Sequence, residues 1–299
     1  MTWTVNRITG ALGAEVHGVA LNRLSEPQFA ELKALLLEHQ VLFFPEQALS
    51  IDDHVELGKR FGPLDAHPNL KNPFTDRTDI FELAASAGGI ADEWHTDLTF
   101  QTEPAVLSIL HLVRCPEVGG DTMWASMTAA FDALSEPMKA FLEELTALHD
   151  ALPHHRPDRM AVHPVIRVHP DTGRRALYVN EHFTRRIVEL SAEESDALLG
   201  YLTRWVASPR FTVRYRWAEG TFCMWDNRCT QHCVMNDFNG ERVIQRVTVM
   251  GDRPEGTGSQ RWQPYLRGGA LSATSRHDRQ LQFFLNDRPY HLGPKPDAA

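Results

Sequence analysis

The chain has 299 residues, 42% of them hydrophobic, which is enough to build the core of one large domain or two small ones. Its formal net charge of −9 makes it a poor candidate for binding a nucleic-acid backbone, and no apolar run approaches the roughly 20 residues that cross a bilayer. The N-terminus lacks the charged-then-apolar pattern of a signal peptide, so we expect a cytoplasmic enzyme or binding protein with no nucleic-acid or membrane partner.

Four helices are predicted, each after a serine that can accept a hydrogen bond from a first-turn N–H group: Ser25, Ser50, Ser135 and Ser191. Gln28 and Glu194 follow the first and last of these serines by three residues and complete the pattern of a capping box. We expect the second helix to stop at Gly62, the third to run to about Leu148 and the fourth to end before Pro209.

Most of the remaining chain predicts short strands separated by turns. The strands are expected at residues 41–44, 106–113, 121–125, 165–168, 176–179, 211–217, 221–225 and 242–250. Many short strands with helices mostly outside them indicate a mainly β fold with surrounding helices, either a jelly roll or a barrel. We expect residues 1–254 to form this single domain and residues 255–299 to be a C-terminal extension of unknown role, with a helix at 280–285.

The stretch EWHTDLTF, residues 93–100, contains a His-x-Asp pair, His95 and Asp97. Its aromatic and β-branched residues favour a strand or a strand end, where side chains two residues apart point to the same face. A second copy, His169 with Asp171, is followed by Thr-Gly, a pattern typical of a turn. The first copy could supply two metal ligands. A distant histidine would complete the two-histidine, one-carboxylate triad that suits Fe(II) chemistry with oxygen.

His232 is the best-placed third ligand, because it lies after a predicted hairpin and just before the final strand. It is flanked by Cys229 and Cys233, which suggests the alternative of a structural zinc site, but no second Cys/His pair of that kind lies nearby. We expect these two cysteines, with Cys115 and Cys223, to be thiols in a reducing compartment.

Two arginines of the final strand, Arg242 and Arg246, share parity and should point to the same face. Either both face solvent while the valines between them face the core, or both lie inside a cavity, where buried charges need partners. Arginine binds carboxylates through two parallel hydrogen bonds and also suits sulfate-like anions. The second alternative therefore predicts two anionic ligands near one metal, a cosubstrate and a substrate.

Five separated motifs in this chain resemble the TauD/TfdA family of Fe(II)/2-oxoglutarate-dependent dioxygenases: WHTDLTF, PEVGGDTMWASM, HPVIRVHPDTGRRALYVNEHFTRRI, WDNRCTQH and RVIQRVTVMGDRP. The resemblance covers roughly residues 5–254 and implies a double-stranded β-helix, or jelly roll. It implies that iron is held by His95, Asp97 and His232, with dioxygen and 2-oxoglutarate as cosubstrates. It further implies a small anionic organosulfur substrate and, from the family habit of assembling, a homo-oligomer.

The resemblance also implies the residues that bind the two anions. Thr122 and Arg242 match the residues that bind the 2-oxoglutarate carboxylates, and Arg246 matches the arginine that binds a sulfonate. His67 is similar to a second sulfonate-binding residue, although a histidine before proline is usually a surface residue. Phe183 is similar to an aromatic residue that lines the substrate pocket, although it could equally belong to a plain core.

The substrate side departs from the pattern of taurine-binding members at two positions. Leu70 stands where those members have tyrosine, and Ala91 where they have asparagine. We therefore expect a larger or more apolar sulfonate or an alkyl sulfate rather than taurine. The alternatives are a related dioxygenase acting on a carboxylate such as an aryloxyalkanoate, a jelly-roll binding module that has lost catalysis, and a zinc hydrolase.

Overall fold

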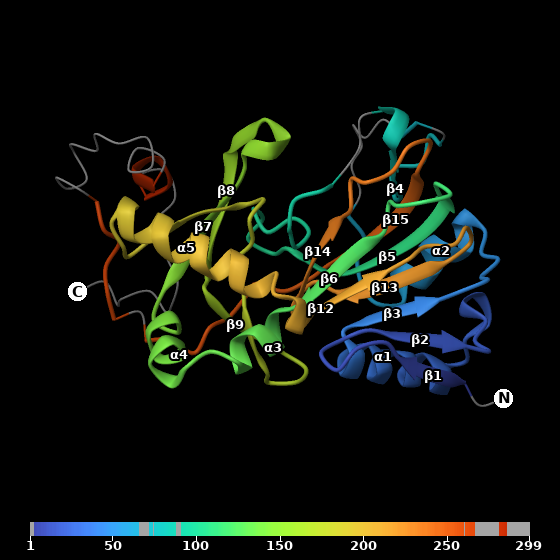
Figure 1. The fold of residues 1–299 in the computed structure, drawn as a ribbon, viewed down its shortest axis with the longest axis horizontal. Helices are drawn as coiled ribbons and strands as arrows, with labels where there is room; N and C mark the ends of the chain where they lie inside the picture. The colour runs from blue at the N-terminus through green and yellow to red at the C-terminus, as the bar shows by residue number, and fades with distance from the viewer. Residues whose placement is uncertain are drawn as a thin grey trace. The chain divides into compact units, whose positions relative to one another are not determined.

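A computed structural model of the chain describes residues 3–65, 72–73, 75–87, 91–259, 261–266 and 281–285 (Figure 1). The described residues form two compact units. The first unit takes its residues from segments 1–97, 105–126 and 207–252, and the second from segments 98–104, 127–206 and 253–299. The predicted metal ligands His95, Asp97 and His232 all belong to the first unit.

The first unit is built on two sheets that consist mainly of antiparallel strands. The larger sheet has the order β1 (Thr4–Arg7), β2 (Ala14–His17), β3 (Val41–Phe44), β13 (Phe222–Asp226), β5 (Ala105–Arg114), β15 (Val243–Met250) and β4 (Phe81–Ala84). The smaller sheet has the order β12 (Thr212–Tyr215), β6 (Thr122–Ser126) and β14 (Thr230–Val234). Among these pairs only β2 and β3 run parallel in the described part of the chain. The short helix η1 (Leu21–Arg23) lies between β2 and α1 (Glu26–His39), η2 (Ala85–Ala87) lies between β4 and β5, and η4 (Pro209–Phe211) directly precedes β12.

Apolar side chains cover both faces of the larger sheet. On one face, residues of β3, β5 and β13 form a cluster with α1 (Glu26–His39) and α2 (Ile51–Lys59) that includes Phe29, Leu57 and Met224. On the other face, aromatic side chains of both sheets fill the space between them, and Phe43 stacks on Tyr215 with ring centroids 3.8 Å apart. Burial of each of these large apolar side chains contributes about 1.5–3 kcal/mol to the stability of the fold. The smaller sheet is thereby fixed over the larger one, as in a jelly roll.

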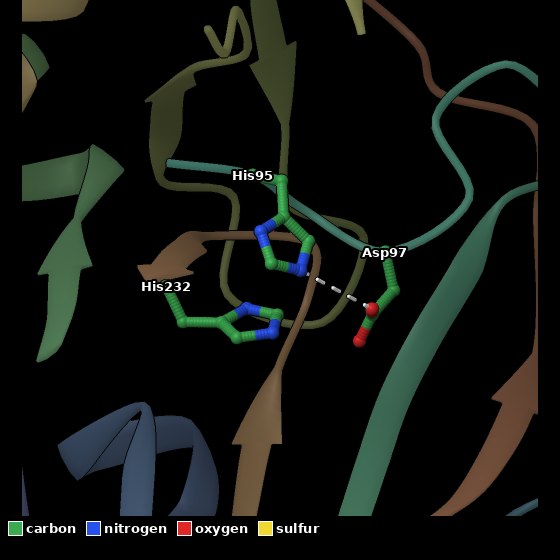
Figure 2. Close-up of side chains that lie close together, drawn as sticks. All are labelled: His95, Asp97 and His232. Atoms are coloured by element: carbon green, nitrogen blue, oxygen red, sulfur yellow. Dashed lines mark ion pairs between the residues drawn. The ribbon is translucent and has the colours of Figure 1, made fainter. Parts of the chain in front are cut away.

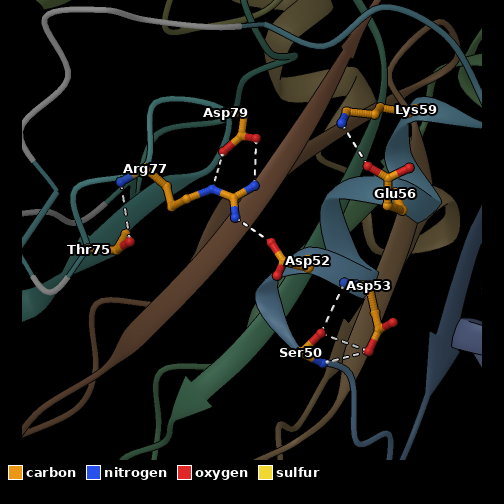
Figure 3. A network of polar contacts seen from close by, with 8 residues as sticks. All are labelled: Ser50, Asp52, Asp53, Glu56, Lys59, Thr75, Arg77 and Asp79. Carbon is orange, nitrogen blue, oxygen red and sulfur yellow. Dashed lines mark hydrogen bonds and ion pairs between the residues drawn. The ribbon is translucent and has the colours of Figure 1, made fainter.

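Both helices of the first unit begin at the predicted serine caps. Ser25 and Gln28 exchange hydrogen bonds in a capping box at the start of α1. Ser50 and Asp53 do the same at the start of α2 (Figure 3). These caps satisfy N–H groups of the first turn that have no partner within the helix, which is why the helices begin there.

A cluster of charged side chains ties residues 75–79 to the first turn of α2 (Figure 3). The Arg77 guanidinium donates two hydrogen bonds to the Asp79 carboxylate, at 2.8 and 2.7 Å, and one to Asp52 at 2.5 Å. The Asp52 side chain is largely exposed, so its ion pair contributes at most about 1 kcal/mol. Its effect is to fix the approach of the chain to β4 at the edge of the larger sheet.

The described part of the second unit includes small sheets and several helices. The sheets have the orders β11 (Thr184–Ile187), β7 (Thr146–Ala151), β8 (Arg156–Pro164) and β10 (Arg175–Leu177), β9 (Ile166–Val168). The helices are α3 (Met127–Asp132), α4 (Glu136–Leu142) and α5 (Ala192–Val206), with the short helix η3 (Leu152–His154) between β7 and β8. Residues 281–285 are helical, and Leu281 and Phe284 are buried against side chains of this unit. Part of the C-terminal extension therefore belongs to a hydrophobic core.

The predicted mainly β fold with surrounding helices is confirmed, and most predicted strands are present within a few residues. The predicted end of the third helix was wrong, because α4 ends at Leu142 and residues 146–151 form strand β7. Every residue of β7 is buried, and its sequence, TALHDA, lacks the alternation of apolar and polar residues that marks a half-buried strand. In the part of the chain that the structure describes, no helix has the length and apolar character to span a membrane.

Candidate metal centre

A backbone bridge brings the two histidines of the site together. The N–H of His95 donates to the carbonyl of His232 at 3.0 Å, and the N–H of His232 donates to the carbonyl of His95 at 2.8 Å. The two rings consequently lie 4.1 Å apart between centroids. His232 is part of β14, whereas His95 pairs with it outside any longer strand. We expected a strand around residues 93–100 with His95 and Asp97 on one face. The structure has only this one bridge there, and residues 97–100 form a turn.

The Asp97 carboxylate completes a compact group of three possible ligands. One ligand atom from each of His95, Asp97 and His232 lies within 4.8 Å of the others, and all three residues are buried. Figure 2 shows the three side chains pointing toward one another. The distance from His95 Nε2 to Asp97 Oδ1 is 3.9 Å, so these two atoms face the same space.

The protonation states of the three side chains suit a cation. The Nδ1 of His95 lies 2.8 Å from the carbonyl oxygen of Glu93, which can only accept, so Nδ1 carries a hydrogen and Nε2 is the ring nitrogen that faces Asp97. Burial, with help from the nearby His95, holds the pKa of His232 well below its usual value, so His232 is neutral at neutral pH. Burial alone would raise the pKa of Asp97, but the positive charge of Arg246 and the hydrogen bond from Ser108 hold it below its usual value. Two histidines and one carboxylate make a donor set that fits Fe(II).

Thr122 and Arg242 form a second buried polar group. The Thr122 hydroxyl oxygen accepts hydrogen bonds from Trp217 Nε1 at 2.9 Å and from Arg242 Nη2 at 3.2 Å. Both lone pairs are therefore in use, and the hydroxyl hydrogen is left to donate to another group. Arg242 Nε also donates to the carbonyl of Gly120 at 3.0 Å. Burial lowers the pKa of Arg242 to about 10, which leaves it charged at neutral pH.

Arg246 contacts the candidate metal ligand directly. Its Nη1 donates to Asp97 Oδ1 at 2.7 Å, and its guanidinium carbon lies 5.1 Å from the ring centroid of Phe81. Its Nε atom is buried and has no hydrogen-bond partner among the described residues. The prediction that Arg242 and Arg246 lie inside rather than facing solvent agrees with these contacts, since both guanidinium groups are largely buried.

The other predicted substrate residues are placed less completely. Phe183 is buried in the second unit, where its ring packs against Phe100 at 5.3 Å between centroids, so a role in substrate binding stays a prediction. Ala91 lies in the first unit, and its carbonyl accepts a hydrogen bond from Val234 at 2.8 Å. His67 and Leu70 lie outside the described residues.

The second His-x-Asp copy is the turn that its sequence predicts. His169 Nδ1 accepts hydrogen bonds from the N–H groups of Asp171 and Thr172 at 3.2 and 3.3 Å. These two hydrogen bonds hold the His169 ring against the backbone of the turn. All four cysteines are free thiols, as expected.

The geometry and the motifs both agree with one family of enzymes. The family model described as "Taurine catabolism dioxygenase TauD, TfdA family" matches residues 4–248. The chain belongs to the TauD/TfdA family. It is an enzyme, and the predicted class of 2-oxoglutarate-dependent non-haem iron dioxygenases and the predicted jelly roll are confirmed.

Three relatives illustrate how fully this family member aligns. An alkylsulfatase of Acinetobacter baylyi is 36% identical over 306 residues, which cover 94% of this chain and 95% of that protein. An alpha-ketoglutarate-dependent sulfate ester dioxygenase of Pseudomonas putida is 36% identical, with coverage of 86% and 92%. The crystal structure of a taurine dioxygenase from Burkholderia xenovorans matches with a TM-score of 0.78 and 34% identity, with coverage of 90% and 97%. Dioxygen and 2-oxoglutarate are therefore the cosubstrates of this enzyme, and iron is the metal of its family.

Sequence reasoning missed three residues that contact this site or its neighbours. Trp217 donates to Thr122, Ser108 donates to Asp97, and Asn227 donates to Ser108. The only sequence signal for Ser108 is that it is the one hydroxyl residue in the apolar run of β5, AVLSILHLVR.

Proposed function

We propose that the enzyme hydroxylates the carbon that bears the sulfur group of an alkyl sulfate or a related sulfonate, with Fe(II) held by His95, Asp97 and His232. The observation that supports this proposal is that a candidate metal centre and two largely buried arginines belong to the same unit. A buried two-histidine, one-carboxylate centre lies next to one arginine, Arg246, while a second arginine lies with Thr122. One arginine for each of two anions fits a 2-oxoglutarate cosubstrate and an anionic substrate.

The iron, when bound, activates dioxygen for the oxidation of a C–H bond while 2-oxoglutarate is converted to succinate and carbon dioxide. The protein residues then have to bind the cosubstrate and the substrate and hold them in the right orientation. The free hydroxyl hydrogen of Thr122 and the remaining N–H groups of Arg242 are the donors for one 2-oxoglutarate carboxylate. Their burial supports tight binding of a charged group, because a buried ion pair is poorly screened by water.

Arg246 is the proposed partner of the substrate anion. Its unpartnered Nε can donate to an anion oxygen, and its position beside Asp97 would place that anion near the proposed metal ligands. An anion held there would bring the carbon that bears it close to the residues that would hold the iron. Hydroxylation of a carbon that bears a sulfate ester places a hydroxyl and a sulfate on the same carbon, and this product collapses to an aldehyde and sulfate. A sulfonate substrate gives an aldehyde and sulfite in the same way.

The apolar substitutions in the substrate motifs favour an alkyl sulfate over taurine. Ala91 and Leu70 carry no group that could recognise an amine, and the relatives with the names alkylsulfatase and sulfate ester dioxygenase are similar over nearly the whole chain. We therefore propose an alkyl sulfate as the substrate and Fe(II) as the metal. The reduced state of all four cysteines supports a cytoplasmic location.

The alternative is a carboxylate substrate such as an aryloxyalkanoate. Arg246 could bind a carboxylate or a sulfate, so this residue does not separate the two classes. The products separate them, because only sulfur-bearing substrates release sulfate or sulfite.

The test is a product assay on the purified enzyme with Fe(II), 2-oxoglutarate and dioxygen. We expect succinate, an aldehyde and inorganic sulfate in equal amounts from medium-chain alkyl sulfates. Turnover of aryloxy acids with no turnover of any sulfate or sulfonate would contradict the proposed substrate class. Addition of Fe(II) and 2-oxoglutarate without oxygen should give a weak visible charge-transfer band, and a colourless sample would contradict the metal centre itself.

A further inference from the structure

The two oxygens of the Asp97 carboxylate have different partners. Oδ1 faces His95 Nε2 at 3.9 Å and accepts from Arg246 at 2.7 Å. Oδ2 accepts a hydrogen bond from the hydroxyl of Ser108 at 2.7 Å, on the central strand β5. The carboxylate therefore has one oxygen at the metal centre and one oxygen held by the protein interior.

Ser108 is itself held by a buried hydrogen-bonded chain. Asn227 Nδ2 donates to the Ser108 hydroxyl oxygen at 2.9 Å, and Trp225 Nε1 donates to Asn227 Oδ1 at 3.0 Å. The same Oδ1 lies 3.3 Å from the backbone N of Asp97, which donates to it. Ser108, Asn227 and Trp225 are fully buried. We call Trp225, Asn227 and Ser108 the Asp97 support chain.

The direction of every hydrogen bond in the support chain follows from Trp225. An indole N–H can only donate, and so can the backbone N–H of Asp97, so the atom of Asn227 that faces them must be its carbonyl oxygen. The amide nitrogen of Asn227 must then face Ser108 and donate to it. Ser108 accepts from Asn227 through a lone pair, and its one hydroxyl hydrogen is directed to Asp97 Oδ2, because an ionised carboxylate oxygen can only accept. Ser108 therefore always presents a donor to the carboxylate.

The register of the larger sheet holds this arrangement in place. Ser108 of β5 lies directly opposite Trp225 of β13, and the backbone N–H of Asn227 donates to the carbonyl of Val106 at 2.9 Å. Asn227 thus contacts β5 through both its backbone and its side chain. Neither Ser108 nor Asn227 can shift without breaking bonds of the sheet.

We propose that Ser108 and Asn227 are positioning residues for the metal ligand, which hold Oδ2 of Asp97 so that Oδ1 alone is presented to the metal. This inference rests on the proposed function, because it takes Asp97 as an iron ligand. A carboxylate anchored through one oxygen binds a metal through the other and leaves coordination positions open for 2-oxoglutarate and dioxygen. The orientation is set before the metal arrives, so that binding does not have to order the side chain.

The test measures metal affinity rather than turnover. Mn(II) is titrated into the protein without cosubstrates, and free Mn(II) is followed by its electron paramagnetic resonance signal. Loss of a hydrogen-bonded group behind a metal ligand typically weakens binding about 10–100-fold, and we expect a loss of this size for Ser108→Ala. Ser108→Thr keeps a hydroxyl and should bind within a few-fold of wild type. Ser126→Ala, which removes another fully buried strand serine of the same unit outside the support chain, should not change the affinity.

Asp97→Ala separates failure of this inference from failure of the proposed function. If Asp97→Ala binds Mn(II) as tightly as wild type, the metal centre is wrong and the support role is overturned with it. If Asp97→Ala loses binding while Ser108→Ala keeps wild-type affinity, the metal centre stands and the support chain is only structural. Should Ser108→Ala fail to fold, as judged by circular dichroism, Ser108→Cys provides the same test. It has nearly the volume of serine but is a weak donor, so it should also weaken binding, and wild-type affinity in this variant would overturn the inference.

Discussion

The guanidinium of Arg246 and the carboxylate of Asp97 form an ion pair 2.7 Å long, so the proposed substrate-binding arginine touches a proposed metal ligand. Each charge offsets the cost of burying the other, because an unpaired buried charge would strongly destabilise the fold. A bound metal competes with Arg246 for Asp97 Oδ1, and a bound anion competes with Asp97 for Arg246. The metal and the anionic substrate are therefore expected to favour one another's binding.

Replacement of Arg246 by alanine should separate substrate binding from metal binding. We expect kcat/KM for the alkyl sulfate to fall on the order of 100-fold or more, because a buried charged partner of the anion is lost. The charge-transfer band of Fe(II) with 2-oxoglutarate should remain. Arg246→Lys keeps the charge without the planar two-pronged donor and should recover only part of the activity. Loss of 2-oxoglutarate binding in Arg246→Ala would mean that the roles of the two arginines are interchanged.

Replacement of Thr122 by valine should weaken 2-oxoglutarate and leave the metal unaffected. The variant removes the only hydroxyl hydrogen that the contacts with Trp217 and Arg242 leave free, at a cost of about 1–2 kcal/mol. We expect the KM for 2-oxoglutarate to rise roughly tenfold, with unchanged Mn(II) affinity in the absence of cosubstrate. Thr248→Val, at another buried threonine of the same unit, is the matched control. An unchanged KM would exclude Thr122 from the cosubstrate site.

The two His-x-Asp copies should behave differently when a histidine is removed. His232→Ala should abolish Mn(II) binding at micromolar concentrations, because it deletes one of the three proposed protein ligands. His169→Ala should keep wild-type affinity for Mn(II), because its Nδ1 serves the turn at residues 169–172. It should lower stability by about 1 kcal/mol, measured by urea unfolding. Retained binding in His232→Ala would contradict the assignment of the third ligand.

Buried His54 should make stability depend on pH in the mildly acidic range. Burial lowers its pKa to about 3, whereas the unfolded chain takes up this proton near pH 6.5. The unfolded state thus binds more protons below pH 6.5, and the stabilising contribution, complete at neutral pH, is lost as pH falls toward 3. The loss between pH 7 and pH 5 should be about 2 kcal/mol from this residue. His54 Nε2 contacts the Ile109 carbonyl, which accepts, and His54→Gln keeps a donor there.

Urea unfolding of wild type and His54→Gln at both pH values measures this dependence. The slope of the unfolding free energy with pH should flatten in His54→Gln. Equal slopes in the two proteins would show that His54 is protonated in the folded state or that its proton uptake is offset elsewhere.

Features that depend on neighbours within a few residues could be predicted from the sequence. The caps at Ser25 and Ser191 involve bonds to residues three positions away, and both are present. The turn at His169 is equally local. The types of the three candidate ligands, and the two arginines of the final strand, follow from residue chemistry and from the family motifs.

Where local patterns failed, a distant part of the chain decided the outcome. Residues 146–148 were expected to be helical, but they complete a buried strand because β8 and β11 lie on either side. His95 and Asp97 converge without a continuous strand between them, because the bridge to His232 fixes the first and a turn directs the second. The strand alternation that we expected therefore does not explain why the side chains of His95 and Asp97 lie close together.

By itself, the sequence determined the caps, the local turns, the mainly β class and the chemical type of the proposed ligands. Only the tertiary structure decided which carboxylate oxygen of Asp97 faces the two histidines and which residue donates a hydrogen bond to the other oxygen. Ser108 and Asn227 are 119 positions apart in the chain, and their contact exists because β5 and β13 pair in one particular register. Hydrogen bonds between such distant residues depend on strand register and on burial from water, which no local pattern encodes.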